Sequence, residues 1–376
     1  MVKGSTNLAL LQEGQILRDT YEIERYLGEG AFAEVYRAKH RFLGRQAMKV
    51  FKLPGLTLQE LEKMLGEAVL LSRLNHPNIV RLFDANVLCE GGQNYGFFTM
   101  EYVAGGSLDQ FWRSYGNKFV PVPTVVEVIK QVCRGLVAAH SQDPPVIHRD
   151  IKPQNILIGY DKDGLRARVS DFGLAKTVNP LTLMASARGT RCFKSPEAFD
   201  DFNADSCAGD VWATGTTLYL LLTDRLPFDI PDDPSTVTSK MFKTAPIVPS
   251  RLNALCDANL DEIVAKSLAF DPKQRFHTAV EFLAALEGWT PHLTSTPTRQ
   301  NQGSPSFQTS KEVLGVHSPA NEETARRMAR EAVQLAQDAA RLNDAADLME
   351  EALNKFPALR SEYQGRVKLW RRGISM

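Results

Sequence analysis

The residues best suited to chemistry lie in one short stretch, from His148 to Asn155, which reads His-Arg-Asp-Ile-Lys-Pro-Gln-Asn. Asp150 could accept a proton from a hydroxyl group, and Lys152 could offset negative charge that develops on a reacting group. Asn155 offers an amide oxygen, and Asp171, in the sequence Asp-Phe-Gly, offers a carboxylate 16 residues later. Mg²⁺ prefers such hard oxygen ligands and usually takes the remainder from substrate phosphates. The pattern therefore predicts phosphate chemistry assisted by a divalent cation.

A glycine-containing turn near the N-terminus could bind phosphate groups. Gly28-Glu-Gly30 follows one strand-like run and precedes another. Glycines let backbone amides approach phosphate oxygens because no Cβ stands in the way. A dinucleotide-binding fold would place a helix after these glycines, whereas the sequence Glu34-Val-Tyr-Arg-Ala38 favours a strand. Taken alone, the turn is equally typical of an ordinary hairpin.

Lys49 and Glu67 form a second candidate pair. Lys49 lies on the next expected strand, and Glu67 lies within an expected helix 18 residues later. A buried lysine keeps its charge when a carboxylate lies beside it, and its ammonium group can then reach a phosphate as well. Most Lys–Glu pairs are solvated surface groups, so this pair gains meaning only together with the residues around Asp150. All these elements in this order predict one phosphate-binding site.

The first hundred residues are predicted to form a strand-rich lobe. One helix interrupts it, because Thr57 and Glu60 form a capping box ahead of apolar residues at helical spacing, and His76-Pro77 ends this helix. The other segments resemble strands through alternation and the turns that bound them. These strand-like segments are residues 21–27, 35–38, 46–51, 79–87 and 95–103.

The chain becomes largely helical after Gly105-Gly106. Thr124 and Glu127 repeat the capping-box pattern ahead of an amphipathic run, which predicts another helix. Residues 146–175 read as short strands and loops, and helical patterns resume over residues 205–287. The candidate acids and amide therefore belong to short strands and loops within a second, mainly helical lobe.

The C-terminal part begins with a segment that cannot bury a core. Residues 290–318 are rich in Ser, Thr and Pro and lack periodicity, which predicts a flexible linker. Residues 319–376 are helical again, and the spacing of Ala345, Met349 and Ala352 before Pro357 resembles the second half of a tetratricopeptide repeat, although the first-half signature is absent. Two interpretations stay open: a small helical module that binds a protein partner, and a packed C-terminal tail.

Composition excludes several classes of protein. Across 376 residues, 44 Lys and Arg balance 44 Asp and Glu, which removes the electrostatic case for nucleic acid or an anionic membrane as the main partner. The five cysteines are scattered without a Cys-x-x-Cys pair, so neither a disulfide framework nor a structural zinc site is expected. No basic-then-apolar leader opens the sequence, and its most apolar stretch, Val211 to Leu222, is too short to span a bilayer. We expect a soluble, cytoplasmic protein.

The sequence from about Tyr21 to Leu286 resembles the eukaryotic-like serine/threonine protein kinases through a whole ordered set of motifs. This resemblance implies an α+β fold of two lobes, a small β-rich N-lobe with one helix and a larger helical C-lobe. The expected organisation is an N-terminal extension (1–20), a kinase domain (21–289, with N-lobe 21–99, hinge 100–106 and C-lobe 107–289), the linker (290–318) and a helical segment (319–376). The motifs are Gly28/Gly30/Ala33, Ala47-Met-Lys49, Glu67, His148-Arg-Asp150, Asp171-Phe-Gly173, Ser195-Pro-Glu197, Asp210-Val-Trp-Ala-Thr-Gly215 and Arg275.

The resemblance also implies a role for each matching residue. Lys49, paired with Glu67, would hold the α- and β-phosphates of ATP, Asp150 would act as the base, and Lys152 would contact the γ-phosphate. Asn155 and Asp171 would bind Mg²⁺, for which Mn²⁺ is an expected substitute. The expected nucleotide-binding residues are Leu27, Gly28, Gly30, Val35, Ala47, Lys49, the gatekeeper Met100, Glu101, Val103 and Leu157.

The expected activity is transfer of the ATP γ-phosphoryl group to protein hydroxyls. Lys152 and Thr190 resemble the serine- and threonine-directed members of the family, and autophosphorylation is expected at Thr182 or Ser186. Ala33 and Ser195 depart from the usual glycine and alanine, and we expect modest effects from both. Gln154 and Leu220 stand where basic-directed members carry acids, which puts a preference for basic substrates in doubt.

Two alternatives to an active protein kinase remain. A pseudokinase scaffold that presents its C-terminal helices to partners would have lost Lys49, Asp150, Asn155 or Asp171, yet all four are present. A small-molecule kinase would lack the Ser-Pro-Glu loop that begins at Ser195. Protein substrates are thus the expected partners, with a further protein expected at the C-terminal helices and neither nucleic acid nor a membrane span.

Overall fold

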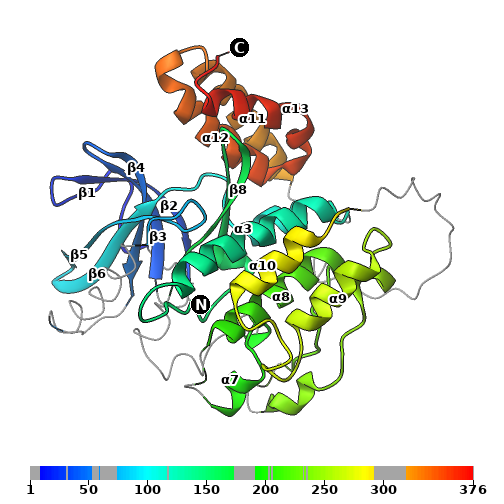
Figure 1. Cartoon of the computed structure of the whole chain (residues 1–376). Coiled ribbons are helices and arrows are strands. Elements are labelled where there is room, and N and C mark those ends of the chain that lie inside the picture. The colour runs from blue at the N-terminus through cyan, green and yellow to red at the C-terminus, as the bar shows by residue number, and fades with distance from the viewer. Residues whose placement is uncertain are drawn as a thin grey trace, which may run out of the picture. The chain divides into compact units, whose positions relative to one another are not determined.

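The computed structural model describes residues 9–30, 33–52, 59, 74–116, 118–172, 191–201, 204, 206–231, 233, 236–291 and 319–375. The chain divides into two compact units, each of which is described by itself (Figure 1). The first unit is Met1–Val103 with Leu174–Ala185, and the second unit is Ala104–Gly173 with Ser186–Met376. The division after Val103 lies within the expected hinge.

The first unit contains an antiparallel sheet. Among the described residues its strand order is β1-β2-β3-β4-β6-β5, so only β6 and β5 depart from chain order (Figure 1). Successive side chains of a strand point to opposite sides, and the central strands β4 and β6 carry buried residues on both sides. The strands are β1 (Ile16–Leu17), β2 (Tyr21–Glu29), β3 (Ala33–His40), β4 (Gly44–Phe51), β5 (Leu82–Glu90) and β6 (Gln93–Glu101).

One face of this sheet carries the core of the first unit. Tyr36, Met48 and Phe97 come from three adjacent strands and are fully buried in a single cluster. Leu11 and Leu17 belong to the same cluster, so residues before the expected kinase domain also pack on the sheet. The residues that alternate with these in β3, β4 and β6 point to the opposite face of the sheet.

The second unit is mainly helical. The long helix α3 packs beside α10 and α8, and its other neighbour is a two-stranded hairpin of β7 and β8 (Figure 1). These elements are α2 (Leu108–Arg113), α3 (Val122–His140), β7 (Ile156–Asp161), β8 (Gly164–Val169), α7 (Glu197–Asp200), α8 (Cys207–Thr223), α9 (Ala258–Ser267) and α10 (Ala279–Gly288). Short 3-10 turns join them at η1 (Pro153–Asn155), η3 (Ser239–Phe242) and η4 (Pro249–Arg251).

Helix α8 forms the centre of the second unit. All its residues from Asp210 to Thr223 are buried, which explains why its sequence is apolar on every side rather than amphipathic. The Ser206 side chain caps its N-terminus by accepting from the Gly209 N–H. At its other end Asp224 adopts a left-handed conformation and accepts from Trp112 Nε1 at 2.6 Å. The helix is thereby fixed at both ends.

Some expectations about helix starts were wrong. Helix α3 begins at Val122 with Pro121 as its N-cap and no side-chain cap, so the predicted capping box at Thr124 does not form. Pro123 explains the difference, because a proline suits the first turn and extends the helix beyond the predicted start. A capping box does form at Ser107 and Gln110, at the start of α2. Most of the helix expected from Thr57 lies outside the described residues, and so does Glu67, whereas Leu74 to His76 at its expected end are described and are not helical.

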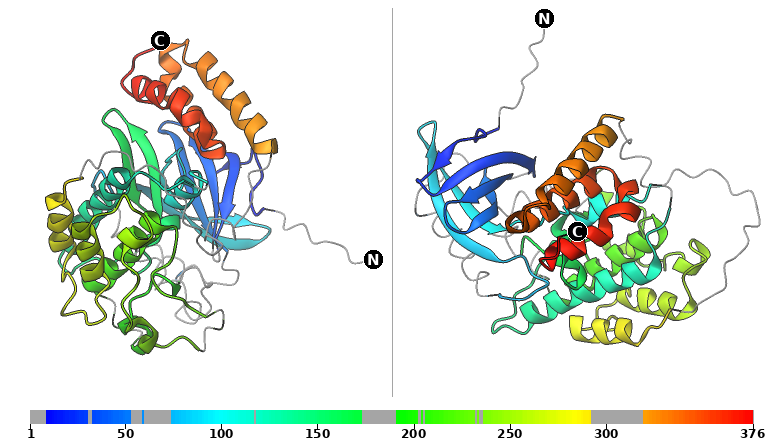
Figure 2. Two further views of the ribbon diagram at one scale, coloured as in Figure 1. Left: turned by 90° about the vertical axis from the view of Figure 1, so that its right-hand side faces the viewer. Right: turned by 90° about the horizontal axis from the view of Figure 1, so that it is seen from above.

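The C-terminal segment contains the helices α11 (Pro319–Leu335), α12 (Leu342–Lys355) and α13 (Arg360–Arg371). Two short 3-10 turns, η6 (Ala339–Arg341) and η7 (Pro357–Leu359), join them. Helices α11 and α12 run side by side, and buried alanines between them allow a close approach (Figure 2). The same apolar cluster contains Tyr160 of β7. Within the second unit, the helices therefore pack against the β7–β8 hairpin.

No helix of the described chain has the length and apolar character needed to cross a lipid bilayer.

Candidate active site

The loop that carries Asp150 is held by Asp210 in the first turn of α8. Asp210 Oδ2 accepts from the His148 N–H at 2.8 Å, and Oδ1 accepts from the Arg149 N–H at 2.9 Å. His140 Nε2, at the end of α3, lies 2.9 Å from Oδ2. Asp210 is only 2% exposed, and a buried carboxylate is stable when several donors surround it. These bonds hold Arg149 in a left-handed conformation, with φ of 71°.

Asp150 receives two donors on one carboxylate oxygen. Lys152 Nζ and Asn155 Nδ2 each lie 2.8 Å from Asp150 Oδ2, and Asn155 Nδ2 also donates to the Asp150 carbonyl at 2.8 Å. Among the described residues, no hydrogen bond reaches Oδ1. The carboxylate is therefore fixed through one oxygen, and the other is left for a hydroxyl group.

The β7–β8 hairpin brings Asn155 and Asp171 to its open end. Asn155 directly precedes β7, and Ile156 pairs with Val169 at the end of β8. Ser170 ties the two chain segments together, because its N–H and its Oγ donate to the Asn155 carbonyl at 2.8 and 3.0 Å. Asp171 is the next residue and adopts a left-handed conformation, with φ of 62°. The structure thus brings Asp150, Asn155 and Asp171 together.

His148 connects this hairpin end to the loop that carries Asp150. Its Nε2 lies 2.8 Å from the Ser170 carbonyl, and its Nδ1 accepts from the Asp150 N–H at 3.2 Å. Both ring nitrogens of His148 are therefore engaged, one by the hairpin end and one by the loop that carries Asp150. The ring centroid of Phe172 lies 4.6 Å from that of His148. The Asp-Phe-Gly segment is therefore packed against the loop as far as it is described.

The donor atoms at this end of the hairpin fit a magnesium ion that is shared with phosphates. Asn155 uses its amide hydrogens on Asp150, which leaves Oδ1 as its available acceptor. Within the described chain, no group of three His, Cys, Asp or Glu residues could hold a metal without help. An amide oxygen and one carboxylate suit Mg²⁺ only when substrate phosphates and water complete its shell.

The first unit carries the other predicted residues on the sheet face opposite its core. Gly28 pairs with Val35, and Val35 pairs with Lys49, so the three occupy one register row. Ala47 pairs with Met100 in the next row on the same face. The Lys49 ammonium lies 6.0 Å from the centre of the Phe98 ring. The sheet register therefore groups the predicted nucleotide-binding residues, in a half-buried surface.

The remaining predicted residues are placed as follows. Leu27 is 38% exposed at the end of β2, and the Gly30 N–H donates to the Ala33 carbonyl at 2.8 Å to close the turn. The Glu101 N–H donates to the Arg81 carbonyl at 2.8 Å, and Val103 ends the first unit. In the second unit, Leu157 on β7 forms an isolated bridge with Ser107. Predicted residues outside the described part of the chain are Glu67, Gly173, Thr182, Ser186 and Thr190.

Glu197 and Arg275, which belong to two of the motifs named above, form an ion pair in the second unit. Arg275 donates from Nη1 and Nη2 to the two Glu197 carboxylate oxygens at 2.9 and 3.1 Å. Its guanidinium is buried over the Trp212 ring, 4.9 Å from the ring centre, and Nη1 also donates to the Ala208 carbonyl. A planar, two-pronged contact of this kind fixes the loop around Ser195 against α8.

Sequence reasoning missed two residues that position the site. His140 contributes to the environment of Asp210, and Ser170 ties Asn155 to the segment of Asp171. A histidine at a helix end and a serine after a strand are common, so neither gave a signal in the sequence.

Comparison with known proteins agrees with this geometry. The protein kinase domain model matches residues 21–285. The probable serine/threonine-protein kinase CPE1738 of Clostridium perfringens is 32% identical over 283 residues, which are 73% of this chain and 39% of that protein. Serine/threonine-protein kinase PknB of Mycobacterium leprae is 32% identical over 279 residues, which are 72% of this chain and 43% of that protein.

Solved structures lead to the same family. The crystal structure of the Mycobacterium tuberculosis PknI kinase domain superimposes with a TM-score of 0.56 and 25% identity, over 74% of this chain and 98% of that one. The chain spans about two fifths of the length of the two curated relatives above. Because the family model covers most of the sequence and the matching loops meet as described, the chain belongs to the protein kinase family.

Proposed function

We propose that this protein is an ATP-dependent serine/threonine protein kinase, which transfers the γ-phosphoryl group of ATP to serine and threonine hydroxyls of proteins. The observation that carries the proposal is the arrangement around Asp150. Its carboxylate is held by Lys152 and Asn155, and the hairpin places Asp171 next to the residue that is tied to Asn155. The named relatives are serine/threonine-protein kinases, which supports this choice of acceptor.

The proposed reaction uses these side chains in distinct ways. Asp150 accepts the proton of the substrate hydroxyl while the hydroxyl oxygen bonds to the γ-phosphorus and the bond to the β–γ bridging oxygen breaks. The Lys152 ammonium, 2.8 Å from Asp150 Oδ2, is placed to offset charge on the transferred group. When bound, Mg²⁺ would neutralise charge on the phosphates, and Asn155 and Asp171 are the residues that would hold it.

The first unit would hold the rest of the nucleotide. Lys49, with Glu67 as its proposed partner, would contact the α- and β-phosphates. The glycine turn would lie over the phosphates, and the half-buried face of the sheet would receive the adenine. The proposed contacts are Leu27, Gly28, Gly30, Val35, Ala47, Met100, Glu101 and Val103, with Leu157 from the second unit.

Other parts of the proposal rest on sequence. Autophosphorylation at Thr182 or Ser186 and acceptor selection by Thr190 concern residues outside the described chain. A cytoplasmic location likewise stays a prediction. The pseudokinase alternative is not favoured, because Lys49, Asp150 and the two proposed metal ligands are all present.

The likeness of residues 319–376 to a tetratricopeptide repeat also stays a prediction, as does a separate protein partner for them. Ala345, Met349 and Ala352, which carried that likeness, are fully buried in the cluster that includes Tyr160. A partner would therefore have to bind the exposed faces of these helices.

The test is phosphate transfer by the purified protein. We expect transfer from Mg-ATP to a generic protein substrate, and we expect Asp150→Asn to lower kcat by at least about 100-fold, since the amide cannot accept the proton. Asp19→Asn is the matched control, because it makes the same chemical change in an exposed turn whose left-handed conformation asparagine tolerates. Equal activity of wild type and Asp150→Asn would reject the proposed base.

A further inference from the structure

We propose that the C-terminal helices α11–α13 act as an intramolecular positioning element, which holds β7 and the Gly105–Gly106 backbone in place and thereby sets the affinity for ATP. This inference rests on the proposed function. It assigns the apolar face of the helices to the kinase's own second unit, whereas the sequence left a separate protein partner open.

The apolar contact covers one side of the β7–β8 hairpin. Tyr160 of β7 is 8% exposed in the cluster formed by α11–α13, and Leu165 of β8 packs against the same cluster. On the other side Gln131 of α3 accepts from the Ala167 N–H at 2.8 Å. A two-stranded hairpin is barely stable by itself. Its position therefore depends on α3 and on the C-terminal helices together.

Helix α13 also attaches to α2 through a partly buried arginine. The Arg360 guanidinium lies over the ring of Phe111 at 4.6 Å and over that of Tyr115 at 5.5 Å, and Nη1 donates to Ser114 Oγ. Burial lowers the pKa of Arg360 below its ordinary value, so the helices desolvate this cation on docking. A desolvated cation over two aromatic faces favours one geometry of attachment.

The helices reach the backbone directly after the hinge. Asn354 Nδ2 donates to Gln110 Oε1 at 3.3 Å, and the same Oε1 accepts from the Ser107 N–H at 2.9 Å. A Cβ added at Gly106 would collide with Asn354 and Gln110. At Gly105 it would collide with the Ile158 carbonyl oxygen and lie 3.4 Å from Glu350 Oε2. Gly106 thus leaves room for Asn354 of α12, and Gly105 permits the close approach of the β7 backbone.

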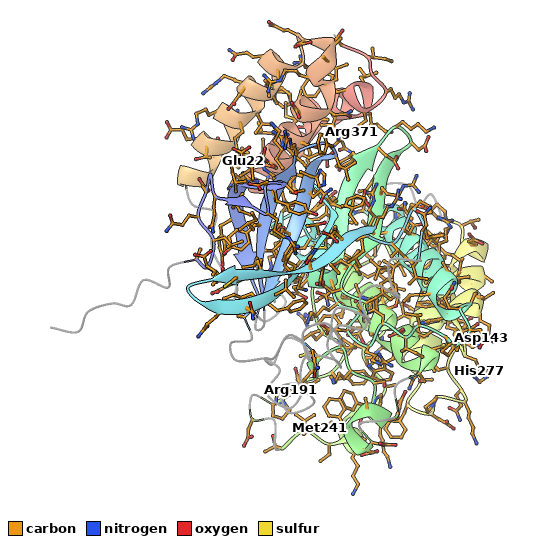
Figure 3. All side chains as sticks on the ribbon, turned by 90° about the vertical axis from the view of Figure 1, so that its left-hand side faces the viewer. Glu22, Asp143, Arg191, Met241, His277 and Arg371 are labelled. Carbon is orange, nitrogen blue, oxygen red and sulfur yellow. The ribbon has the colours of Figure 1, made fainter. Side chains whose placement is uncertain are left out.

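Polar contacts continue along the hairpin to its turn. Glu350 accepts from the backbone N–H of Tyr160 and is bound by Arg371, which lies on α13 (Figure 3). At the turn, Arg372 Nε donates to the Lys162 carbonyl at 2.8 Å. The contact therefore covers two backbone segments, Gly105–Gly106 and the hairpin as far as its turn, which are hydrogen-bonded to each other.

The same backbone carries residues proposed to face the nucleotide and its metal. The Ile158 N–H donates to the Gly106 carbonyl at 2.8 Å, and Leu157 bridges to Ser107. Asn155 lies two residues before Leu157 and directly precedes β7. Release of α11–α13 would free this backbone, so ATP would bind more weakly. The N–H groups of His148 and Arg149, which directly precede Asp150, would stay bound to Asp210, and Lys152 would stay beside the Asp150 carboxylate.

The experiment compares nucleotide binding and turnover in the full chain. Arg360→Ala combined with Asn354→Ala removes two attachments, and we expect KM for ATP and the dissociation constant of ADP to rise about three- to tenfold while kcat stays within about twofold. Hydrogen–deuterium exchange at β7 should become faster. Arg360→Lys should restore part of the affinity, because it retains the cation. Arg327→Ala, an exposed arginine of α11, should match wild type in every measurement.

A second variant keeps the inference testable. Met349→Asp places a carboxylate in the fully buried cluster and should release the helices even if the surface variant does not. Faster exchange at α12 with unchanged affinity for ADP would overturn the proposal. Unchanged KM and ADP affinity in both variants would do the same. Because ADP binding needs no catalysis, failure of the proposed kinase activity would be seen separately, as a wild-type chain that binds nucleotide without transferring phosphate.

Discussion

Among single residues, Asp210 has the most demanding environment in the second unit. Its carboxylate accepts two backbone N–H groups from His148 and Arg149 and lies beside His140, all in a buried position. Asp210→Asn would turn an amide N–H₂ group toward these donors. We expect the free energy of unfolding to fall by about 2 kcal/mol, since a buried donor would lose its acceptor.

Urea denaturation followed by tryptophan fluorescence measures this change, because Trp112, Trp212, Trp289 and Trp370 all belong to the second unit. Asp229→Asn, at an exposed position, is the control and should change the free energy of unfolding by less than about 0.5 kcal/mol. An Asp210→Asn protein as stable as this control would contradict the role assigned to the carboxylate.

The sequence predicted the reactive residues better than the residues that position them. Asp150, Lys152 and Asn155 are informative because carboxylate, amine and amide are rarely combined at this spacing, and the structure does bring them into contact. Ser170 and His140 act through a backbone carbonyl and a distant carboxylate. Such contacts depend on the tertiary packing of the hairpin and of α3, which no local sequence pattern predicts.

At the scale of elements, the attachment of α12 should depend on pH through Glu350. Burial raises the pKa of this carboxyl group to about 7, although Arg371 and the Tyr160 N–H favour its charged form. Arg371 Nη2 donates to Asp347 Oδ1 at 2.6 Å and to Glu350 Oε1 at 2.9 Å. The two carboxylates therefore share one guanidinium group. The folded state therefore binds a proton on Glu350 more tightly than the unfolded state does.

The sign follows from this difference in proton binding. The stabilising effect of protonated Glu350 is complete below the ordinary pKa of about 4.5 and is lost as pH rises through about 7. Glu350→Gln mimics the protonated group, so its protection of α12 against hydrogen exchange should equal that of wild type near pH 4.5 and exceed it at pH 8. Parallel pH profiles for the two proteins would show that Glu350 does not titrate in this range.

Elements were predictable where one pattern acts alone. Strand-like patterns located β2, β3 and β4, and the spacing of Ala345, Met349 and Ala352 located α12, because these patterns are local. Boundaries were less predictable: β5 begins at Leu82, not at residue 79, since its limits follow from pairing with β6. Helix α3 starts before Thr124 because Pro123 fits its first turn.

At the scale of the whole chain, the packing of α11–α13 on the second unit could not be read from periodicity. The apolar spacing of these helices fits a free helical module as well as a packed tail, and what decides between them is Tyr160, which belongs to a distant hairpin. Fewer than 60 residues with an alanine-rich core bury too little apolar surface for much stability of their own. Their stability should therefore depend on the surface that receives them.

This dependence predicts that a defect elsewhere in the second unit weakens α12. Phe282 of α10 is fully buried and lies outside the cluster of the C-terminal helices. Phe282→Ala should lower the opening free energy of protected amides in α8 by about 3 kcal/mol through loss of packing. If docking supplies the stability of α12, its amides should lose a comparable amount when hydrogen exchange is measured at low denaturant concentrations.

The exposed neighbour Val280 offers the control, and Val280→Ala should leave exchange in both helices unchanged within about 0.5 kcal/mol. Protection that falls in α8 of the Phe282→Ala protein but stays at the wild-type level in α12 would identify α11–α13 as an independently stable module. Such a result would show that the apolar contact with Tyr160 contributes little to the stability of these helices, because they would be equally stable when their docking surface is disturbed.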